Sequence, residues 1–143
     1  MIRDIRHTGI VVSDLGASLH FYQNVLGFEI VKQMEESSQY IDNISALSNV
    51  RVTTVKMASP DGQLIELLYY SSHPKKRKSR EVCDVGISHI ALTVDDLNSC
   101  YDRLRSQGVE FNCPPQVSPD GYAKVAFCRA PEGTFIELVE LVG

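Results

Sequence analysis

The sequence predicts an α+β protein built from two copies of one βαβββ module, and two repeated motifs within its 143 residues support this. The segment His-Thr-Gly-Ile-Val-Val-Ser-Asp-Leu at 7–15 returns as His-Ile-Ala-Leu-Thr-Val-Asp-Asp-Leu at 89–97, 82 residues later. The segment Ser-Pro-Asp-Gly-Gln-Leu-Ile-Glu-Leu at 59–67 returns as Ala-Pro-Glu-Gly-Thr-Phe-Ile-Glu-Leu at 130–138, 71 residues later. A repeat of this kind indicates two copies of one supersecondary unit.

The first module begins with an apolar run at 7–12, which predicts a buried strand. Ser13 or Asp14 is a suitable cap for the helix that follows, and Gly27 is a suitable end. The apolar residues of this helix recur at helical spacing: Leu15, Leu19, Tyr22 and Leu26, with Phe21 and Val25 beside them. Strands are then predicted at 28–33, 50–58 and 63–70, with a Pro-Asp-Gly turn at 60–62.

The first module also carries extra residues at about 35–49, which shorten the repeat offset from 82 to 71. Tyr40, Ile41, Ile44 and Leu47 have helical spacing there, so we expect a short amphipathic helix. Two interpretations stay open: a lid over a cavity, or a cap on an exposed sheet edge.

The second module repeats the order of the first. A strand is predicted at 88–94, followed by a helix that is capped near Asp95, runs to Gln107 and stops at Gly108. Strands at about 109–112, 122–129 and 134–141 complete the module, with a Pro-Glu-Gly turn at 131–133.

The chain is expected to form a single domain over 1–143, with modules at 1–72 and 86–143 joined by a linker at 73–85. The linker contains a basic cluster at 74–80 that resembles a nuclear-localisation run. We interpret the cluster as a solvated linker; the alternative is a contact with an acidic or phosphorylated substrate tail.

Composition limits the function classes. The net charge is −4, which argues against general nucleic-acid binding. No apolar stretch is long enough for a membrane span and the start lacks a targeting segment, so we expect a cytoplasmic protein. The four cysteines have no metal-type spacing, and we expect reduced, mostly buried thiols: Cys83, Cys100, Cys113 and Cys128.

The chemistry is expected at a histidine and a glutamate that both repeat: His7 with Glu66, and His89 with Glu137. Side chains alternate along a strand, so each glutamate shares a face with apolar residues, where a carboxylate is costly unless it is paired or bound to a metal. Two such pairs at equivalent positions predict one divalent ion, of Ni, Co, Mn, Fe or Zn, held by four side chains without thiolates. The remaining candidates are read as solvent-exposed or linker residues: Glu140, His20 and His73.

These modules and motifs resemble the vicinal oxygen chelate superfamily, which includes glyoxalase I, methylmalonyl-CoA epimerase, bleomycin-resistance proteins and extradiol dioxygenases. The resemblance covers nearly the whole chain and implies curled sheets around a metal site. The family pattern places the four ligands at His7, Glu66, His89 and Glu137. A glutamate at the second position is similar to the four-ligand, glyoxalase-like branch.

The resemblance implies a metal-dependent lyase or isomerase of the glyoxalase I type, which removes a proton next to a carbonyl through a metal-stabilised enediolate. Glu137 or Glu66 would be the base. The expected partner is a small molecule such as a hemithioacetal, an acyl-CoA or another α-oxygenated carbonyl compound, and a homodimer is expected. Tyr122 and Lys124 either face this substrate or are ordinary strand residues.

Three alternatives on the same fold stay open. The first is an epimerase-like racemase, in which the proton returns to the same carbon. The second is a dioxygenase or thiol transferase, which requires one glutamate to leave the metal. The third is a non-catalytic ligand-binding protein, which would need no metal.

Overall fold

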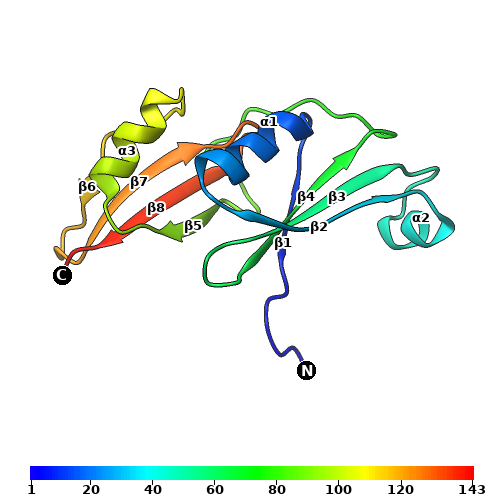
Figure 1. The fold of residues 1–143 in the computed structure, drawn as a ribbon, viewed down its shortest axis with the longest axis horizontal. Coiled ribbons are helices and arrows are strands. Elements are labelled where there is room, and N and C mark those ends of the chain that lie inside the picture. Colours follow the sequence, from blue (N-terminus) through cyan, green and yellow to red (C-terminus); the bar gives the residue numbers. More distant parts are fainter. The chain divides into compact units, whose positions relative to one another are not determined.

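A computed structural model describes all residues from 1 to 143, and the chain divides into two compact units, Met1–Arg77 and Lys78–Gly143 (Figure 1). The boundary falls inside the predicted linker at 73–85. Each unit contains a four-stranded mixed sheet, and the strand order is equivalent in the two sheets. The predicted α+β class and the two βαβββ modules are therefore confirmed, while the single domain over 1–143 stays a prediction.

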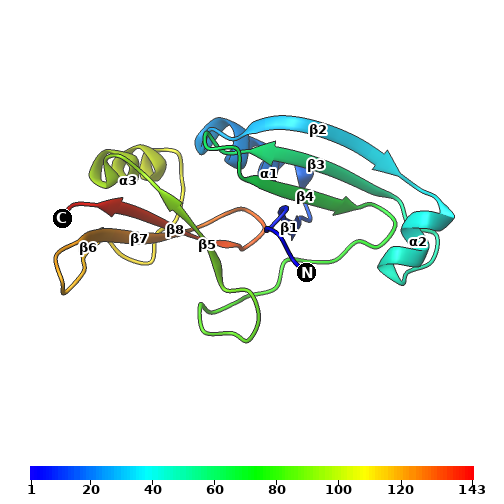
Figure 2. The ribbon, with the colours of Figure 1, turned by 90° about the horizontal axis from the view of Figure 1, so that it is seen from below.

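The first unit follows the predicted order of elements, with one helix inserted after its second strand (Figures 1 and 2). Its elements are β1 (Thr8–Val11), α1 (Leu15–Leu19), η1 (His20–Val25), β2 (Glu29–Glu36), α2 (Gln39–Ser45), β3 (Val52–Ala58) and β4 (Leu64–Tyr70). The sheet order is β1-β4-β3-β2. Strand β1 is parallel to β4, and the other neighbours are antiparallel.

The second unit has the same plan without the inserted helix. Its elements are β5 (His89–Thr93), α3 (Leu97–Ser106), β6 (Gln116–Val117), β7 (Ala123–Arg129) and β8 (Phe135–Leu141). The sheet order is β5-β8-β7-β6, and β5 is parallel to β8.

The first helix has the predicted cap, stripe and end. The Asp14 side chain accepts a hydrogen bond from the backbone of Ala17 at 3.0 Å, and Gly27 has a positive φ of 86°. The second half is a π-helix, in which the Leu26 amide donates to the Phe21 carbonyl five residues earlier. Phe21, Tyr22 and Val25 form the buried centre of the stripe.

Each sheet buries one face under its helix and leaves the other face more open. In the first unit, the fully buried strand residues alternate with polar ones: Val55, Met57 and Leu67 lie at 0% exposure beside Thr54, Lys56 and Glu66. In the second unit, helix α3 contributes Leu97 and Leu104 to the core, and β7 and β8 contribute Ala126, Cys128, Ile136 and Leu138. The repeated glutamates therefore lie on the face opposite the core.

The inserted helix α2 lies within the segment predicted for it. Its buried residue Ile41 packs in a cluster with Val50 and Val52, against which Leu68 and Tyr70 also pack. In the strand register Tyr70 is opposite Val52 and lies on the same face as Glu66. Helix α2 thus covers one end of the open face.

The strand predicted at 109–112 is wrong. Phe111 forms only an isolated bridge with Cys128, and the edge strand is instead the two-residue β6. Pro114 and Pro115 stand between the two segments. Proline has no backbone N–H group to donate, which interrupts a continuous edge strand at this point.

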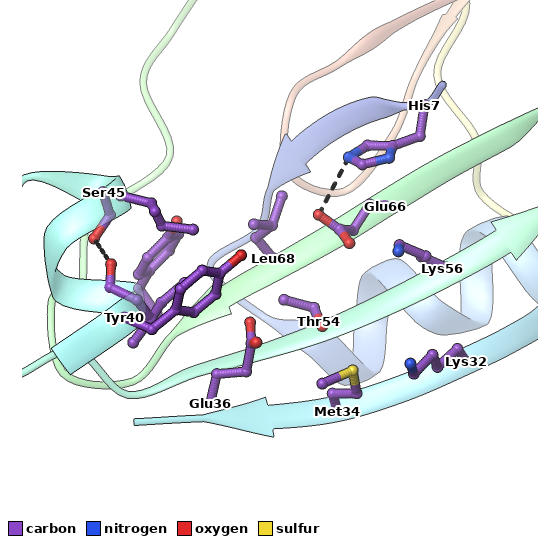
Figure 3. A pocket seen from close by; sticks show the side chains of 13 residues that line it. His7, Lys32, Met34, Glu36, Tyr40, Ser45, Thr54, Lys56, Glu66 and Leu68 are labelled. Carbon is purple, nitrogen blue, oxygen red and sulfur yellow. Dashed lines mark hydrogen bonds and ion pairs between the residues drawn. The ribbon is translucent and has the colours of Figure 1, made fainter. Parts of the chain in front are cut away.

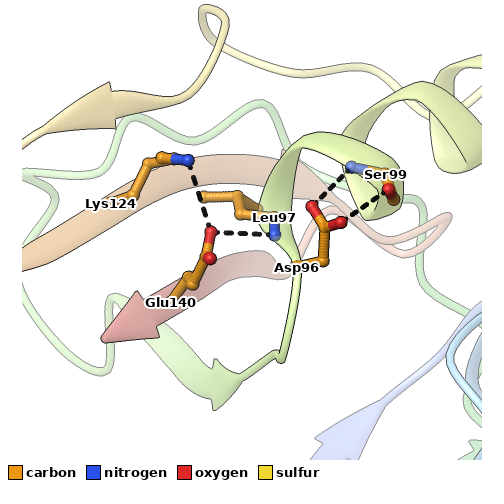
Figure 4. A network of polar contacts seen from close by, with 5 residues as sticks. All are labelled: Asp96, Leu97, Ser99, Lys124 and Glu140. Carbon is orange, nitrogen blue, oxygen red and sulfur yellow. Dashed lines mark hydrogen bonds and ion pairs between the residues drawn. The ribbon is translucent and has the colours of Figure 1, made fainter. Parts of the chain in front are cut away.

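The prediction that Glu140 is solvated is also wrong (Figure 4). Its carboxylate accepts a hydrogen bond from the Leu97 amide at 3.1 Å and lies 3.5 Å from the Lys124 ammonium, and its side chain is 19% exposed. Glu140 therefore binds the first turn of α3, where a negative charge is favourable. Lys124 is opposite Glu140 in the register, so it lies on the helix side of the sheet, away from Glu137.

We expect Glu140→Ala to lower the free energy of unfolding by about 1–2 kcal/mol, because it removes a charge-assisted acceptor from an orphan helix amide. Glu140→Gln keeps an acceptor oxygen and should cost about half as much. Urea denaturation of both variants measures the difference. Equal stability of Glu140→Ala and the wild type would contradict the capping role.

The first turn of α3 is capped by Asp96, one residue beyond the predicted position. Its carboxylate accepts hydrogen bonds from the amide and the hydroxyl of Ser99, at 3.0 and 2.8 Å. Both bonds lower the pKa of the Asp96 carboxyl below its usual range, and the bond from the Ser99 amide has the larger effect.

All four cysteines are free, but the expectation of mostly buried thiols is wrong for two of them, since Cys83 and Cys113 are exposed. Cys128 is buried on the helix side of its sheet, and burial raises the pKa of its thiol to about 12. Burial also raises the pKa of the half-buried Cys100 thiol.

None of the helices combines the length and the apolar character that a membrane span requires.

Candidate metal centre

The first unit brings His7 and Glu66 together on its open face. Strand β1 runs parallel to β4 with Gly9 opposite Glu66, so His7 lies two positions earlier on the same side. The His7 Nε2 atom is 3.5 Å from Glu66 Oε1. The dashed line between the two side chains in Figure 3 marks this ion pair. The two side chains are 28% and 15% exposed, so they are sheltered but accessible to a ligand.

The second unit reproduces this arrangement with His89 and Glu137. Ala91 is opposite Glu137 on the parallel strand, and His89 again lies two positions earlier. The His89 Nε2 atom is 2.9 Å from Glu137 Oε2. The ring of Phe127 packs edge-on against His89, with 5.0 Å between centroids. The sequence repeat thus corresponds to a repeated strand register.

In both units the Nε2 atom of the histidine is the one that faces the carboxylate. In the first unit the other ring nitrogen, His7 Nδ1, is buried and has no hydrogen-bond partner. A buried polar atom without a partner is unfavourable, and proteins retain such atoms mainly where function requires them. This observation favours a ligand-holding role for the His7 ring over a purely structural one.

The donor chemistry fits a divalent transition ion. Each pair offers one imidazole nitrogen and carboxylate oxygens, which suit ions of borderline hardness. No third His, Cys, Asp or Glu joins either pair in a group that could hold a metal by itself. Each unit therefore supplies two donors, which is half of the set predicted from the sequence.

A pocket of about 440 Å³ lies on the open face of the first unit (Figure 3). His7 and Glu66 line it together with residues of β2, β3 and helix α2. A volume of this size is typical of sites for small molecules. Tyr40 and Ile44 of helix α2 line the same pocket as His7, so the helix borders a cavity, as in the first of the two interpretations that the sequence left open.

Sequence reasoning missed two lysines of this pocket, Lys32 and Lys56. Both lysines fall within predicted strands. Because Lys56 alternates with the apolar residues Val55 and Met57, the sequence could have placed it on the sheet face opposite the core. The register between the two strands was not readable, because the insertion separates them.

Comparison with known proteins agrees with this fold and repeat. Residues 4–138 match the model of the Glyoxalase/Bleomycin resistance protein/Dioxygenase superfamily. The chain belongs to this superfamily. The resemblance seen in the sequence is therefore confirmed at the level of the family.

Curated members of the superfamily match the chain at low identity. A probable lactoylglutathione lyase of Vibrio cholerae is 27% identical over 136 residues, which cover 95% of this chain and 89% of that protein. A probable lactoylglutathione lyase of Synechocystis is 29% identical, with 94% and 92% covered. The Escherichia coli protein YaeR, named as uncharacterized, is 26% identical over 140 residues, with 97% of each chain covered.

Solved structures of the superfamily share the fold. A glyoxalase family protein of Bacillus cereus has a TM-score of 0.89 at 22% identity, with 100% of this chain and 97% of that chain covered. The trypanothione-dependent glyoxalase I of Leishmania major has a TM-score of 0.71 at 25% identity, with 97% and 87% covered.

Proposed function

We propose that this superfamily member is a metal-dependent lyase or isomerase of the glyoxalase I type. The observation that carries the proposal is the second occurrence of a His–Glu pair in the same strand register. A structural role would explain one such pair, but it gives no reason for both units to keep the same residues. Relatives named lactoylglutathione lyase, at 27–29% identity, support the same reaction class.

We propose that His7, Glu66, His89 and Glu137 together hold one divalent ion of the group Ni, Co, Zn, Mn or Fe. When bound, such an ion acts as a Lewis acid that stabilises negative charge developing on a substrate carbonyl oxygen. The two histidines contribute neutral nitrogen donors, and the glutamates contribute negative charge that favours a cation.

One glutamate is proposed to be the general base. Its carboxylate would take the proton from the carbon next to the carbonyl and deliver it to the neighbouring carbon, which isomerises the substrate without loss of atoms. Return of the proton to the same carbon would give epimerisation instead. The substrate is proposed to be a hemithioacetal, an acyl-CoA or a related α-oxygenated carbonyl compound, while a homodimer and a cytoplasmic location stay predictions.

The metal content of the purified protein tests this proposal. We expect about one ion per chain by mass spectrometry, because four donors that share an ion give this ratio. His7→Ala and His89→Ala should each remove essentially all of the ion, with a loss of affinity of at least about 100-fold. His73→Ala, in the linker, is the matched control and should retain it.

Two results would contradict the shared site. If each histidine variant lost half of the ion, the two pairs would be separate sites. If the wild type held no ion even after reconstitution with each of the five metals, a ligand-binding protein would be the better conclusion.

A further inference from the structure

A row of charged side chains crosses the open face of the first unit beside the His–Glu pair. In the strand register Glu66 on β4 is opposite Lys56 on β3, and Lys56 is opposite Lys32 on the edge strand β2. Directly opposed residues on neighbouring strands point to the same face. Figure 3 shows both lysines in the pocket with Glu66.

Neither lysine forms an ion pair with a protein carboxylate, although Glu66 is opposite Lys56 in the register. Lys32 and Lys56 take no part in the ion pairs His7–Glu66, His89–Glu137 and Lys124–Glu140. The other carboxylate of the pocket, Glu36, is opposite Val52 in the register and forms no ion pair with either lysine. Like charges directly opposite each other on a sheet are destabilising, and the one carboxylate opposite Lys56, that of Glu66, already pairs with His7.

The second unit shows that the fold does not require these lysines. At the position equivalent to Lys56, opposite Glu137, stands Phe127, which packs on His89. The repeat therefore keeps the His–Glu pair and changes the residue beside it. Lysines in register with the glutamate therefore belong to the first unit alone, whereas the second unit has Arg129 on this face, opposite Phe135 and over its ring.

The rest of the pocket is mixed in character. Met34, Leu68 and Ile44 give it apolar surface, and the Tyr40 side chain comes from helix α2 (Figure 3). His7 and Glu66 lie beside the lysines, whereas α2 covers the far end of the same face. A ligand in this pocket would meet positive charge close to the His–Glu pair and apolar surface near α2.

We propose that Lys32 and Lys56 bind an anionic group of the ligand, a carboxylate or a phosphate, and that the adjoining part of the ligand is apolar. An anion between two ammonium groups would remove their mutual repulsion and form charge-assisted hydrogen bonds. That the anionic ligand is the substrate rests on the proposed function. That the pocket binds an anion does not. The substrate is then an acidic carbonyl compound.

Titration with matched probes tests the proposal. We expect hexanoate or hexyl phosphate to bind the purified protein, detected by NMR shifts and by a raised Tm, at least about 10-fold more tightly than neutral hexanamide. The tighter of the two anions identifies the group as a carboxylate or a phosphate. Lys32→Gln and Lys56→Gln should each lower anion affinity about 10-fold, and Lys56→Arg should stay within about 3-fold of the wild type.

The controls separate this site from the metal centre and from folding. Lys124→Gln, on the helix side of the other sheet, should leave anion affinity unchanged. His89→Ala removes a proposed metal donor of the second unit and should still bind the anion, so failure of the metal proposal would leave this result standing. Removing one of two like charges should not lower the Tm of the protein. A loss of anion affinity in a lysine variant can therefore be assigned to the binding site and not to unfolding. Equal affinity for hexanoate, hexyl phosphate and hexanamide, or unchanged anion binding in both lysine variants, would overturn the proposal.

Discussion

Replacing one of the two repeated glutamates, Glu66 or Glu137, by glutamine should lower kcat by about 10²–10⁴-fold even when the metal is saturating. Glutamine keeps an oxygen donor but cannot accept a proton from carbon. The glutamate that only holds the ion should show a smaller loss of kcat and a weaker ion affinity. Comparing Glu66→Gln with Glu137→Gln therefore identifies the base.

The measurement is incorporation of deuterium from D₂O at the carbon next to the carbonyl, with hemithioacetals of glutathione and of small thiols, and with acyl-CoAs. Glu140→Gln is a matched control, because Glu140 lies on the same strand as Glu137 but binds the first turn of α3. Its exchange rate should equal that of the wild type. Full exchange in both Glu66→Gln and Glu137→Gln would exclude these residues as bases.

The largest stability effect is expected from Leu67→Ala. Leu67 is fully buried in β4, which lies between β1 and β3 in the sheet, on the face opposite Glu66. Truncation to alanine removes buried methyl groups and leaves a cavity, so the free energy of unfolding should fall by about 3–5 kcal/mol. Chemical denaturation followed by circular dichroism gives this value.

Leu64→Ala is the matched control, because Leu64 is in the same strand but half-buried on the open face. Its cost should be below about 2 kcal/mol. A similar loss in the two variants would show that the two faces of β4 contribute equally, contrary to the burial pattern.

The sequence was sufficient where the signal is local or repeated. Asp14 caps the first helix and Gly27 ends it, because each acts through its own backbone geometry. It was insufficient at residues 109–112, where the local pattern permits a strand but Pro114 and Pro115 interrupt the edge. It also assigned Glu140 to solvent, because parity gives the face of a residue and not its partner on another element.

For the candidate site, the sequence by itself determined the two His–Glu pairs, because an internal repeat reveals shared positions without any knowledge of distances. Only the tertiary structure decided that each histidine meets its own glutamate, since that contact depends on the parallel pairing of β1 with β4 and of β5 with β8. The same holds for the row of Glu66, Lys56 and Lys32. Most of these registers depend on pairing across long connections, which the pattern of a single strand does not reveal; only β3 and β4 are joined by a short turn, at 59–63.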